Sequence, residues 1–224
     1  MLAYLAREGL ALTAILATHH HGDHVGGVSA LLERFAVPVF GPAREMIPGR
    51  TQAVGDGDVV AVPGFPVTLA AIDIPGHTAG HVAYFGDVDG QPSLFCGDTL
   101  FAAGCGRLFE GTPQQMWTSL SALAKLPAAT KVYCGHEYTL ANLRFALAVE
   151  PGNADLWERQ ASAQALRARG EPTLPSTIGL ERATNPFLRA NLPGVRAAAE
   201  SQAGRPLGSD VDAFAALRAW KNAF

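Results

Sequence analysis

The sequence predicts an α+β fold, with a sheet-rich domain over residues 1–151 and a small helical domain over residues 152–224. Helix-like and strand-like patterns alternate at first, strand-like runs dominate the middle, and no convincing strand follows the break at residues 151–153. With 224 residues, 48% of them hydrophobic, the chain can build one sizeable core with a small appendage.

The first domain opens on a helix over residues 2–6, because Arg7 and Glu8 interrupt the apolar stretch and no basic region precedes it, as a signal peptide would require. Residues 12–18 form a short apolar run typical of a strand, and residues 28–35 carry apolar side chains at helical spacing. Five more strands follow, each bounded by Gly, Pro or Asp, at residues 37–40, 59–62, 67–74, 82–85 and 93–96.

Helices return near the boundary. Thr112 is a suitable cap for a helix over residues 113–126, and a strand at 131–134 and a helix at 139–149 come next. Beyond residue 151 we expect a helix at about 155–169, a proline-rich connector and a last helix at about 210–221.

Composition excludes several classes of partner. A formal charge of −3, with no run of like charges, gives no basic field for nucleic acid, and no apolar stretch reaches membrane-spanning length. Cys96, Cys105 and Cys134 are odd in number and form no CxxC pair. They suit reduced thiols in the cytoplasm better than a secreted disulfide framework.

The seven histidines are confined to three short segments, residues 19–24, 77–81 and 136. His19 and His21 lie two apart on an extended segment, so both rings can face one ion, and Asp23 and His24 can turn toward a second point after Gly22. Such a group of imidazoles and carboxylates would be costly to bury without a cation. The pattern therefore indicates a metal site.

These residues also allow other interpretations. A histidine tag would lie at a terminus, whereas this run continues into Gly-Asp-His after a strand. Taken singly, His20 and His81 are equally well read as structural residues, and Asp98 as a turn or N-cap carboxylate. However, His77, Asp98 and His136 each follow a predicted strand, and residues that follow strands at one edge of a sheet can together form a site.

Several motifs resemble glyoxalase II, hydroxyacylglutathione hydrolase, of the metallo-β-lactamase superfamily. They are Thr-His-x-His-x-Asp-His at 18–24, Pro-Gly-His-Thr-x-Gly-His at 75–81, Gly-Asp-Thr-Leu-Phe at 97–101, Gly-Cys-Gly-Arg at 104–107, Gly-His-Glu-Tyr-Thr at 135–139, Asn-Pro-Phe-Leu-Arg at 185–189 and Arg-Ala-Trp-Lys at 218–221. The resemblance spans essentially the whole chain and implies an αββα sandwich followed by a helical, glutathione-binding C-terminal domain.

The resemblance also implies the metal ligands: His19, His21 and His77 for one ion, Asp23, His24 and His136 for the other, and Asp98 bridging both, with His20 and His81 outside the set. Such donors suit two divalent ions, zinc first and iron or manganese as alternatives. Asp23 and Asp98 would position a metal-bound hydroxide, available near pH ~7. A covalent role for Cys105 is disfavoured because no base is paired with it.

The implied reaction converts S-(R)-lactoylglutathione and other S-2-hydroxyacylglutathiones to glutathione and a 2-hydroxy acid such as D-lactate, as in methylglyoxal detoxification. The substrate-binding residues implied are Arg107, Phe109, His136, Tyr138, Arg218 and Lys221. A solvated helix face is the alternative for Arg218 and Lys221. Phe109 stands where some relatives have tyrosine, so one hydroxyl contact to the substrate would be absent.

Relatives carry a few strands and an acidic turn ahead of the first helix, where this sequence starts. We therefore expect the start of this sequence to be internal to a longer protein. We expect the protein to be a monomer, with dimerisation through an exposed sheet edge as the alternative. The rival functions are a mononuclear iron persulfide dioxygenase of the same superfamily and an inactive metal-binding fragment. A nuclease or β-lactamase would leave Arg107, Tyr138, Arg218 and Lys221 unexplained.

Overall fold

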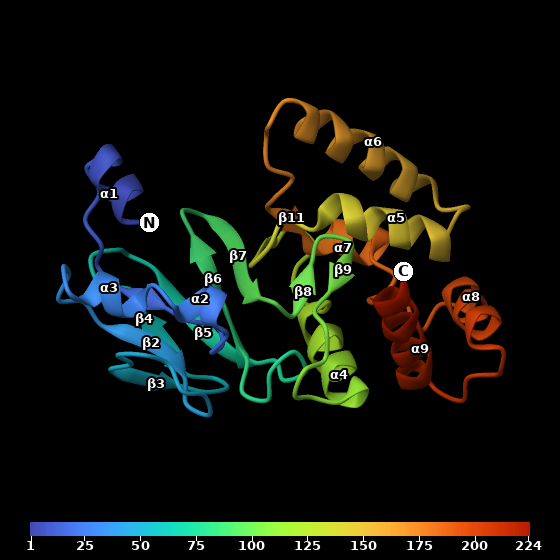
Figure 1. The fold of residues 1–224 in the computed structure, drawn as a ribbon, viewed down its shortest axis with the longest axis horizontal. Helices are drawn as coiled ribbons and strands as arrows, with labels where there is room; N and C mark the ends of the chain where they lie inside the picture. The colour runs from blue at the N-terminus through green and yellow to red at the C-terminus, as the bar shows by residue number, and fades with distance from the viewer.

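Two β-sheets lie between two groups of helices in the computed structural model, which describes residues 1–224 (Figure 1). The smaller sheet is parallel and has the order β1 (Ile15–Leu16), β2 (Val39–Pro42), β3 (Gln52–Val54). The larger sheet has the order β11 (Ser176–Thr177), β10 (Lys131–Cys134), β7 (Gln91–Gly97), β6 (Val82–Val88), β5 (Thr68–Asp73), β4 (Val59–Ala61). Only the β10–β7 pair in it is parallel.

Alternation along β6 shows how the layers pack. Val82 and Tyr84 belong to the cluster between the two sheets, whereas Ala83 and Phe85 face the cluster on the other side of the large sheet. On the outer side of the small sheet, Val25 and Val28 pack against its buried residues. The fold is therefore the αββα sandwich that the sequence analysis expected.

The helices are α1 (Leu2–Glu8), α2 (Gly22–Val25), α3 (Val28–Leu32), α4 (Pro113–Leu123), α5 (Thr139–Val149), α6 (Ala154–Ala168), α7 (Ile178–Thr184), α8 (Pro193–Ala203) and α9 (Asp210–Ala223). Helix α4 begins at a complete capping box, in which Thr112 and Gln115 satisfy each other's backbone N–H groups. None of the helices is long and apolar enough to cross a membrane.

The C-terminal helices share a core with the large sheet. Phe187 and Phe214 are fully buried in the same cluster as Leu94 of β7 and Val132 of β10. In addition, β11 pairs with β10 at the edge of the sheet. The division near residue 151 stays a prediction, but the two parts are packed as one body against this face.

Several expected elements were wrong in detail. The proline-rich connector contains α7, α8 and the short strand β11, although no strand was expected after residue 151. Strand β3 and the hairpin of β8 (Leu100–Phe101) and β9 (Gly104–Cys105) were not expected, nor was α2. The first strand has only two residues, and α3 ends at Leu32 instead of residue 35. Strands this short lack the period-two alternation on which prediction relies.

Candidate metal centre and substrate pocket

The strand directions bring the histidine segments together. Strands β5, β7 and β10 point the same way, so the segments that carry His77, Asp98 and His136 leave the large sheet at one edge. The small sheet is tied to this edge because the Val82 N–H donates to the Thr18 carbonyl, directly before His19. Helix α2 then presents Asp23 and His24 to the same place.

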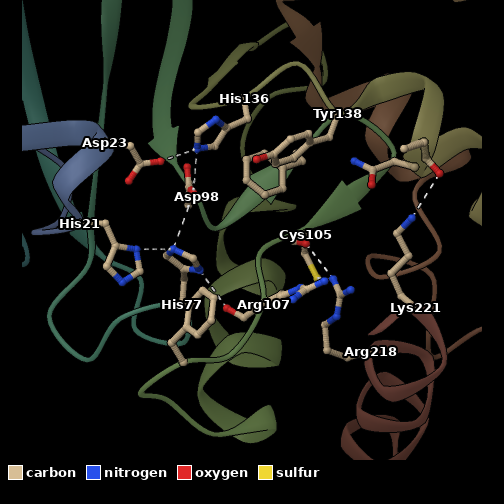
Figure 2. A pocket seen from close by; sticks show the side chains of 14 residues that line it. His21, Asp23, His77, Asp98, Cys105, Arg107, His136, Tyr138, Arg218 and Lys221 are labelled. Carbon is tan, nitrogen blue, oxygen red and sulfur yellow. Dashed lines mark hydrogen bonds and ion pairs between the residues drawn. The ribbon is translucent and has the colours of Figure 1, made fainter. Parts of the chain in front are cut away.

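The first group of candidate ligands is His19, His21 and His77, whose donor atoms lie within 4.8 Å of one another. His77 Nε2 is 3.0 Å from His21 Nδ1 (Figure 2). The His77 Nδ1–H donates to the Arg107 carbonyl over 2.8 Å, so its Nε2 carries a lone pair. Buried His19 Nε2 has no hydrogen-bond partner.

The second group is Asp23, His24 and His136, which meets the same 4.8 Å limit. Asp23 Oδ2 is 3.3 Å from His136 Nε2, which in turn lies 3.3 Å from His24 Nε2. Asp98 stands between the groups: its Oδ1 is 3.2 Å from His24, and its Oδ2 is 3.2 Å from His136 and 3.6 Å from His77.

These contacts fit bound cations. Imidazole lone pairs and carboxylate oxygens converge on two neighbouring points, and the buried His19 Nε2 has no hydrogen-bond partner there. Buried polar atoms without partners are rare in folded proteins, and a divalent ion would satisfy this one. The two groups thus have the arrangement that the ligand set implied by the resemblance requires. The role of each residue as a metal ligand is a proposal.

Burial and charge shift the pKa values of these groups in different directions. Burial is the main cause that lowers the pKa of His19 and of His77, so both are neutral at pH 7. Burial alone would raise the pKa of Asp98, but the close His24, with His136 and His77, brings it below its ordinary value. The His24 pKa is raised, chiefly by Asp98.

Glycines leave room for the cluster at two close approaches. A Cβ on Gly135 would lie 2.3 Å from Asp98 Oδ1 and 2.7 Å from a His24 ring carbon. A Cβ on Gly106 would lie 1.9 Å from the Asp98 carbonyl oxygen. Both glycines belong to motifs that the sequence analysis singled out, and their role here is steric.

His20 and His81 hold the surrounding segments. The buried His81 ring stacks on His19 with centroids 4.5 Å apart. His20 lies between two carboxylates, with Nδ1 2.9 Å from Glu45 and Nε2 3.2 Å from Glu110. Glu45 was missed in the sequence; this buried carboxylate also accepts from the Gly80 N–H. An isolated Glu in a loop carries no signal of such a role.

All of the predicted substrate-binding residues line one pocket of about 640 Å³ (Figure 2). Five of the seven candidate ligands line it too: His21, Asp23, His77, Asp98 and His136. Tyr138 stacks on His136, with ring centroids 5.0 Å apart. Phe109 is 63% exposed and meets His77 edge to face. Arg107 is exposed at the same rim.

The cationic side of the pocket comes from α9. Arg218 is buried, not a residue of a solvated helix face, and its Nη1 donates to the Cys105 carbonyl over 2.8 Å. Its Nε has no hydrogen-bond partner. Lys221 is half-buried, and its Nζ donates to the Ala141 carbonyl over 3.2 Å. The spacing of three residues does place both cations on one side of the helix, facing the pocket.

Four further lining residues were not predicted as binding residues: Phe101, Cys105, Ala141 and Asn142. Ala141 and Asn142 lie one helical turn after Tyr138, which is a signal that spacing alone could have given. Burial raises the pKa of the Cys105 thiol, although Arg218 opposes the shift. A protonated thiol is a poor nucleophile, which agrees with the earlier reading of Cys105.

Family comparisons cover the whole chain. Residues 1–136 match the metallo-β-lactamase superfamily, and residues 137–224 match the hydroxyacylglutathione hydrolase C-terminus. The hydroxyacylglutathione hydrolase of Cupriavidus taiwanensis is 56% identical, with 99% of this chain and 86% of the relative covered. That of Alkalilimnicola ehrlichii is 58% identical, with 98% and 84% covered.

Solved structures share the fold. ETHE1 from Myxococcus xanthus has a TM-score of 0.63 and 26% identity, over 98% of this chain and 82% of that one. TTHA1623, solved in a di-iron-bound form, has a TM-score of 0.55 and 29% identity, over 83% and 82%. A metallo-β-lactamase from Staphylococcus aureus, 20% identical with a TM-score of 0.61, shows likeness of fold alone.

Proposed function

Because the chain belongs to the hydroxyacylglutathione hydrolase family of the metallo-β-lactamase superfamily, we propose that it hydrolyses S-(R)-lactoylglutathione, and related 2-hydroxyacyl thioesters, to glutathione and a 2-hydroxy acid. One observation carries the proposal: the histidine and carboxylate cluster and the cations of α9 line a single pocket. A thioester at the cluster can therefore have its anionic glutathione portion at Arg218 and Lys221.

The metal content is two divalent ions per chain. His19, His21 and His77 would hold one ion, Asp23, His24 and His136 the other, and Asp98 both. When bound, the ions supply Lewis acidity and lower the pKa of water. Zinc fits the nitrogen-rich donor set, and the TTHA1623 structure shows that a related fold can hold two irons.

The carboxylates orient the reacting groups. Asp23 has a 60% exposed side chain at the pocket, so its carboxylate can accept a hydrogen bond from an attacking water. The Asp98 side chain is 9% exposed, and its backbone N–H is anchored on His81. Asp98 is therefore suited to fix the positions of the candidate ligands, whereas Asp23 is suited to orient an attacking water.

The opposite wall selects glutathione thioesters. The substrate carries carboxylates, which the cations Arg107, Arg218 and Lys221 can bind by charge-assisted hydrogen bonds. Tyr138, 49% exposed, offers a hydroxyl on the path from the cluster to Lys221. Phe109 provides an apolar edge beside His77, without the hydroxyl of tyrosine.

A mononuclear dioxygenase is the weaker candidate. It would need one iron and molecular oxygen, and it would leave the complete second group of Asp23, His24 and His136 without a purpose. The likeness to ETHE1 at 26% identity is lower than that to the hydrolases, which exceeds 50%.

The test compares two thioesters under air and under argon. We expect thiol release from S-lactoylglutathione at equal rates in both atmospheres, and a much higher kcat/KM than for S-lactoylcysteamine, which lacks the carboxylates. Equal kcat/KM values for the two thioesters would contradict the proposed specificity for glutathione thioesters. A rate that requires oxygen would favour the dioxygenase.

A further inference from the structure

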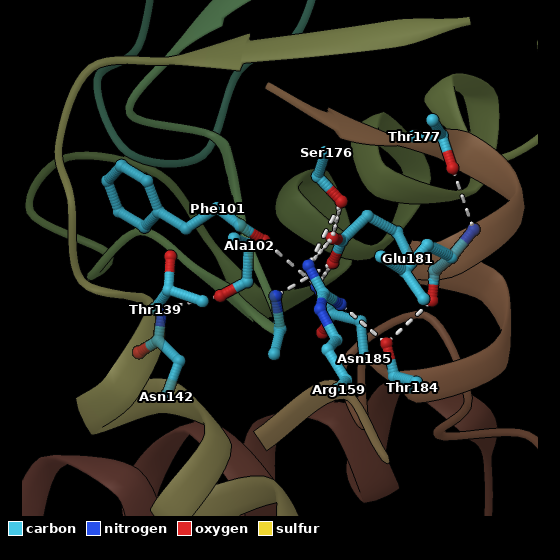
Figure 3. A network of polar contacts seen from close by, with 12 residues as sticks. Phe101, Ala102, Thr139, Asn142, Arg159, Ser176, Thr177, Glu181, Thr184 and Asn185 are labelled. Atoms are coloured by element: carbon cyan, nitrogen blue, oxygen red, sulfur yellow. Dashed lines mark hydrogen bonds and ion pairs between the residues drawn. The ribbon is translucent and has the colours of Figure 1, made fainter. Parts of the chain in front are cut away.

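The β8–β9 hairpin contributes Phe101 and Cys105 to the pocket, and side chains from the C-terminal helices bond its turn on the other side (Figure 3). Toward the pocket, Phe101 meets Tyr138 with ring centroids 5.4 Å apart, and the Cys105 carbonyl accepts from Arg218. The position of this hairpin therefore affects both the aromatic and the cationic parts of the wall.

On its other side, the turn is held by a carboxylate and an amide from α7 and its C-cap. The Ala103 N–H donates to Glu181 Oε2 over 2.8 Å. Asn185 Nδ2 donates to the carbonyls of Phe101 and Gly104, at 3.2 and 2.8 Å. All of these groups are buried, so none of these hydrogen bonds competes with bulk water.

Glu181 is itself fixed by its neighbours. Its Oε1 accepts from Arg159 Nη2 and from the Ser176 hydroxyl, each over 2.5 Å, and its Oε2 also accepts from Asn185 over 2.9 Å. Arg159 Nη1 donates to Thr184. A buried ion pair with this many satisfied hydrogen bonds holds one geometry, and its loss would leave a buried charge without a partner (Figure 3).

The turn needs such support because of Ala103. This residue has φ of 54°, in the left-handed region that a side chain with a Cβ disfavours. Its N–H is the one that Glu181 accepts. We infer that Glu181 and Asn185 are positioning residues that hold the β8–β9 hairpin against the pocket and so set the affinity for the glutathione portion of the substrate.

The inference deepens the proposed function and rests on it. The candidate metal ligands do not touch Glu181 or Asn185, the two residues that we call the clamp. Metal content and the chemical step should therefore be retained when the clamp is weakened. Binding should suffer instead, because Phe101 and the carbonyl that braces Arg218 both move with the hairpin. A purely structural role would lower stability and leave KM unchanged.

The experiment uses the full chain with metal bound, well below each variant's melting temperature. Glu181→Gln and, in case it does not fold, Asn185→Ala are expected to raise KM for S-lactoylglutathione about five-fold, the effect of losing one or two buried hydrogen bonds, with kcat within about two-fold of wild type. Metal-to-protein ratios should equal that of wild type.

Two controls and a rescue are available. Glu150→Gln breaks another, less buried ion pair, Glu150 with Arg189, away from the hairpin, and Asn153→Ala removes an amide that donates to the Ala183 carbonyl of α7. Both should keep the wild-type KM. Adding Ala103→Gly to Glu181→Gln should lower KM part of the way back to the wild-type value, because glycine adopts the left-handed conformation without support.

The outcomes separate the two proposals. An active wild type whose clamp variants keep the wild-type KM would overturn the inference and leave the function standing. An inactive wild type would overturn the function, and the clamp would then be judged by calorimetric binding of glutathione, with the same five-fold weakening expected. A wild type that neither turns over thioester nor binds glutathione would contradict both.

Discussion

The Asp98 backbone N–H donates to Nε2 of His81 over 3.2 Å, so this buried imidazole carries its hydrogen on Nδ1, which faces the Val82 carbonyl at 3.1 Å. Burial lowers the pKa of His81 to about 3, which keeps Nε2 free to accept. The ring also stacks on His19. His81 thus orients two candidate ligands, His19 and Asp98, without being a ligand itself.

We expect His81→Ala to lower both metal affinity, by about ten-fold, and the free energy of unfolding, by about 2 kcal/mol or more, because a ligand support and a fully buried ring are lost together. Metal titration and denaturant unfolding measure the two effects. Wild-type metal affinity in the variant would show that His81 serves packing only.

Asp98→Ala should abolish turnover and metal content together, because the carboxylate lies between the two groups, with Oδ1 near His24 and Oδ2 near His136 and His77. His20→Ala should leave both nearly intact, since its ring bonds Glu45 and Glu110 and not the cluster. Elemental analysis and thiol release check the pair. Equal losses from the two substitutions would disprove the ligand assignment.

Gly135→Ala should reduce metal content severely, because the new Cβ would lie 2.3 Å from Asp98 Oδ1 and must displace that carboxylate. Gly152→Ala is the matched control, since its Cβ meets nothing within 4 Å. Bound metal per folded chain is the measurement. Similar metal content in the two variants would show that the Asp98 segment shifts without cost.

Lys221 should impose a pH dependence on substrate binding. Burial, with Arg218 next, lowers the pKa of its amine from 10.5 to about 8. Because only the protonated amine attracts a carboxylate, KM should be low below pH 8 and rise above it to a plateau at which Arg107 and Arg218 alone bind the substrate. Lys221→Arg keeps its charge and should flatten the profile. If the inflection is unchanged in Lys221→Arg, the inflection belongs to another titrating group.

Much of the site could be predicted because ligands and motifs are local in sequence. The strands that precede His77, Asp98 and His136 were all predicted, and parallel strands put their ends at one edge. The buried state of Arg218 could not be predicted, because it depends on the hairpin and on Phe187, which packs under the guanidinium. The burial of Arg218 is thus decided by tertiary packing and not by the pattern of charged residues along the helix.

The C-terminal helices show a different limit. Helix α8 carries the signals of proline in its first turn and a left-handed glycine after its end, Gly204, yet only Val195 and Ala199 are buried along it. With so little apolar periodicity it was read as connector. The β8–β9 hairpin has two-residue strands whose turn is fixed by Glu181 and Asn185, far along the chain, and no local pattern predicts that.

The most direct measurement is turnover of S-lactoylglutathione while the metal-free chain is titrated with zinc. The binuclear proposal predicts activity that rises with zinc and saturates near two equivalents per chain, with no gain in Asp98→Ala. Full activity at one equivalent, or no activity with two ions bound, would contradict it.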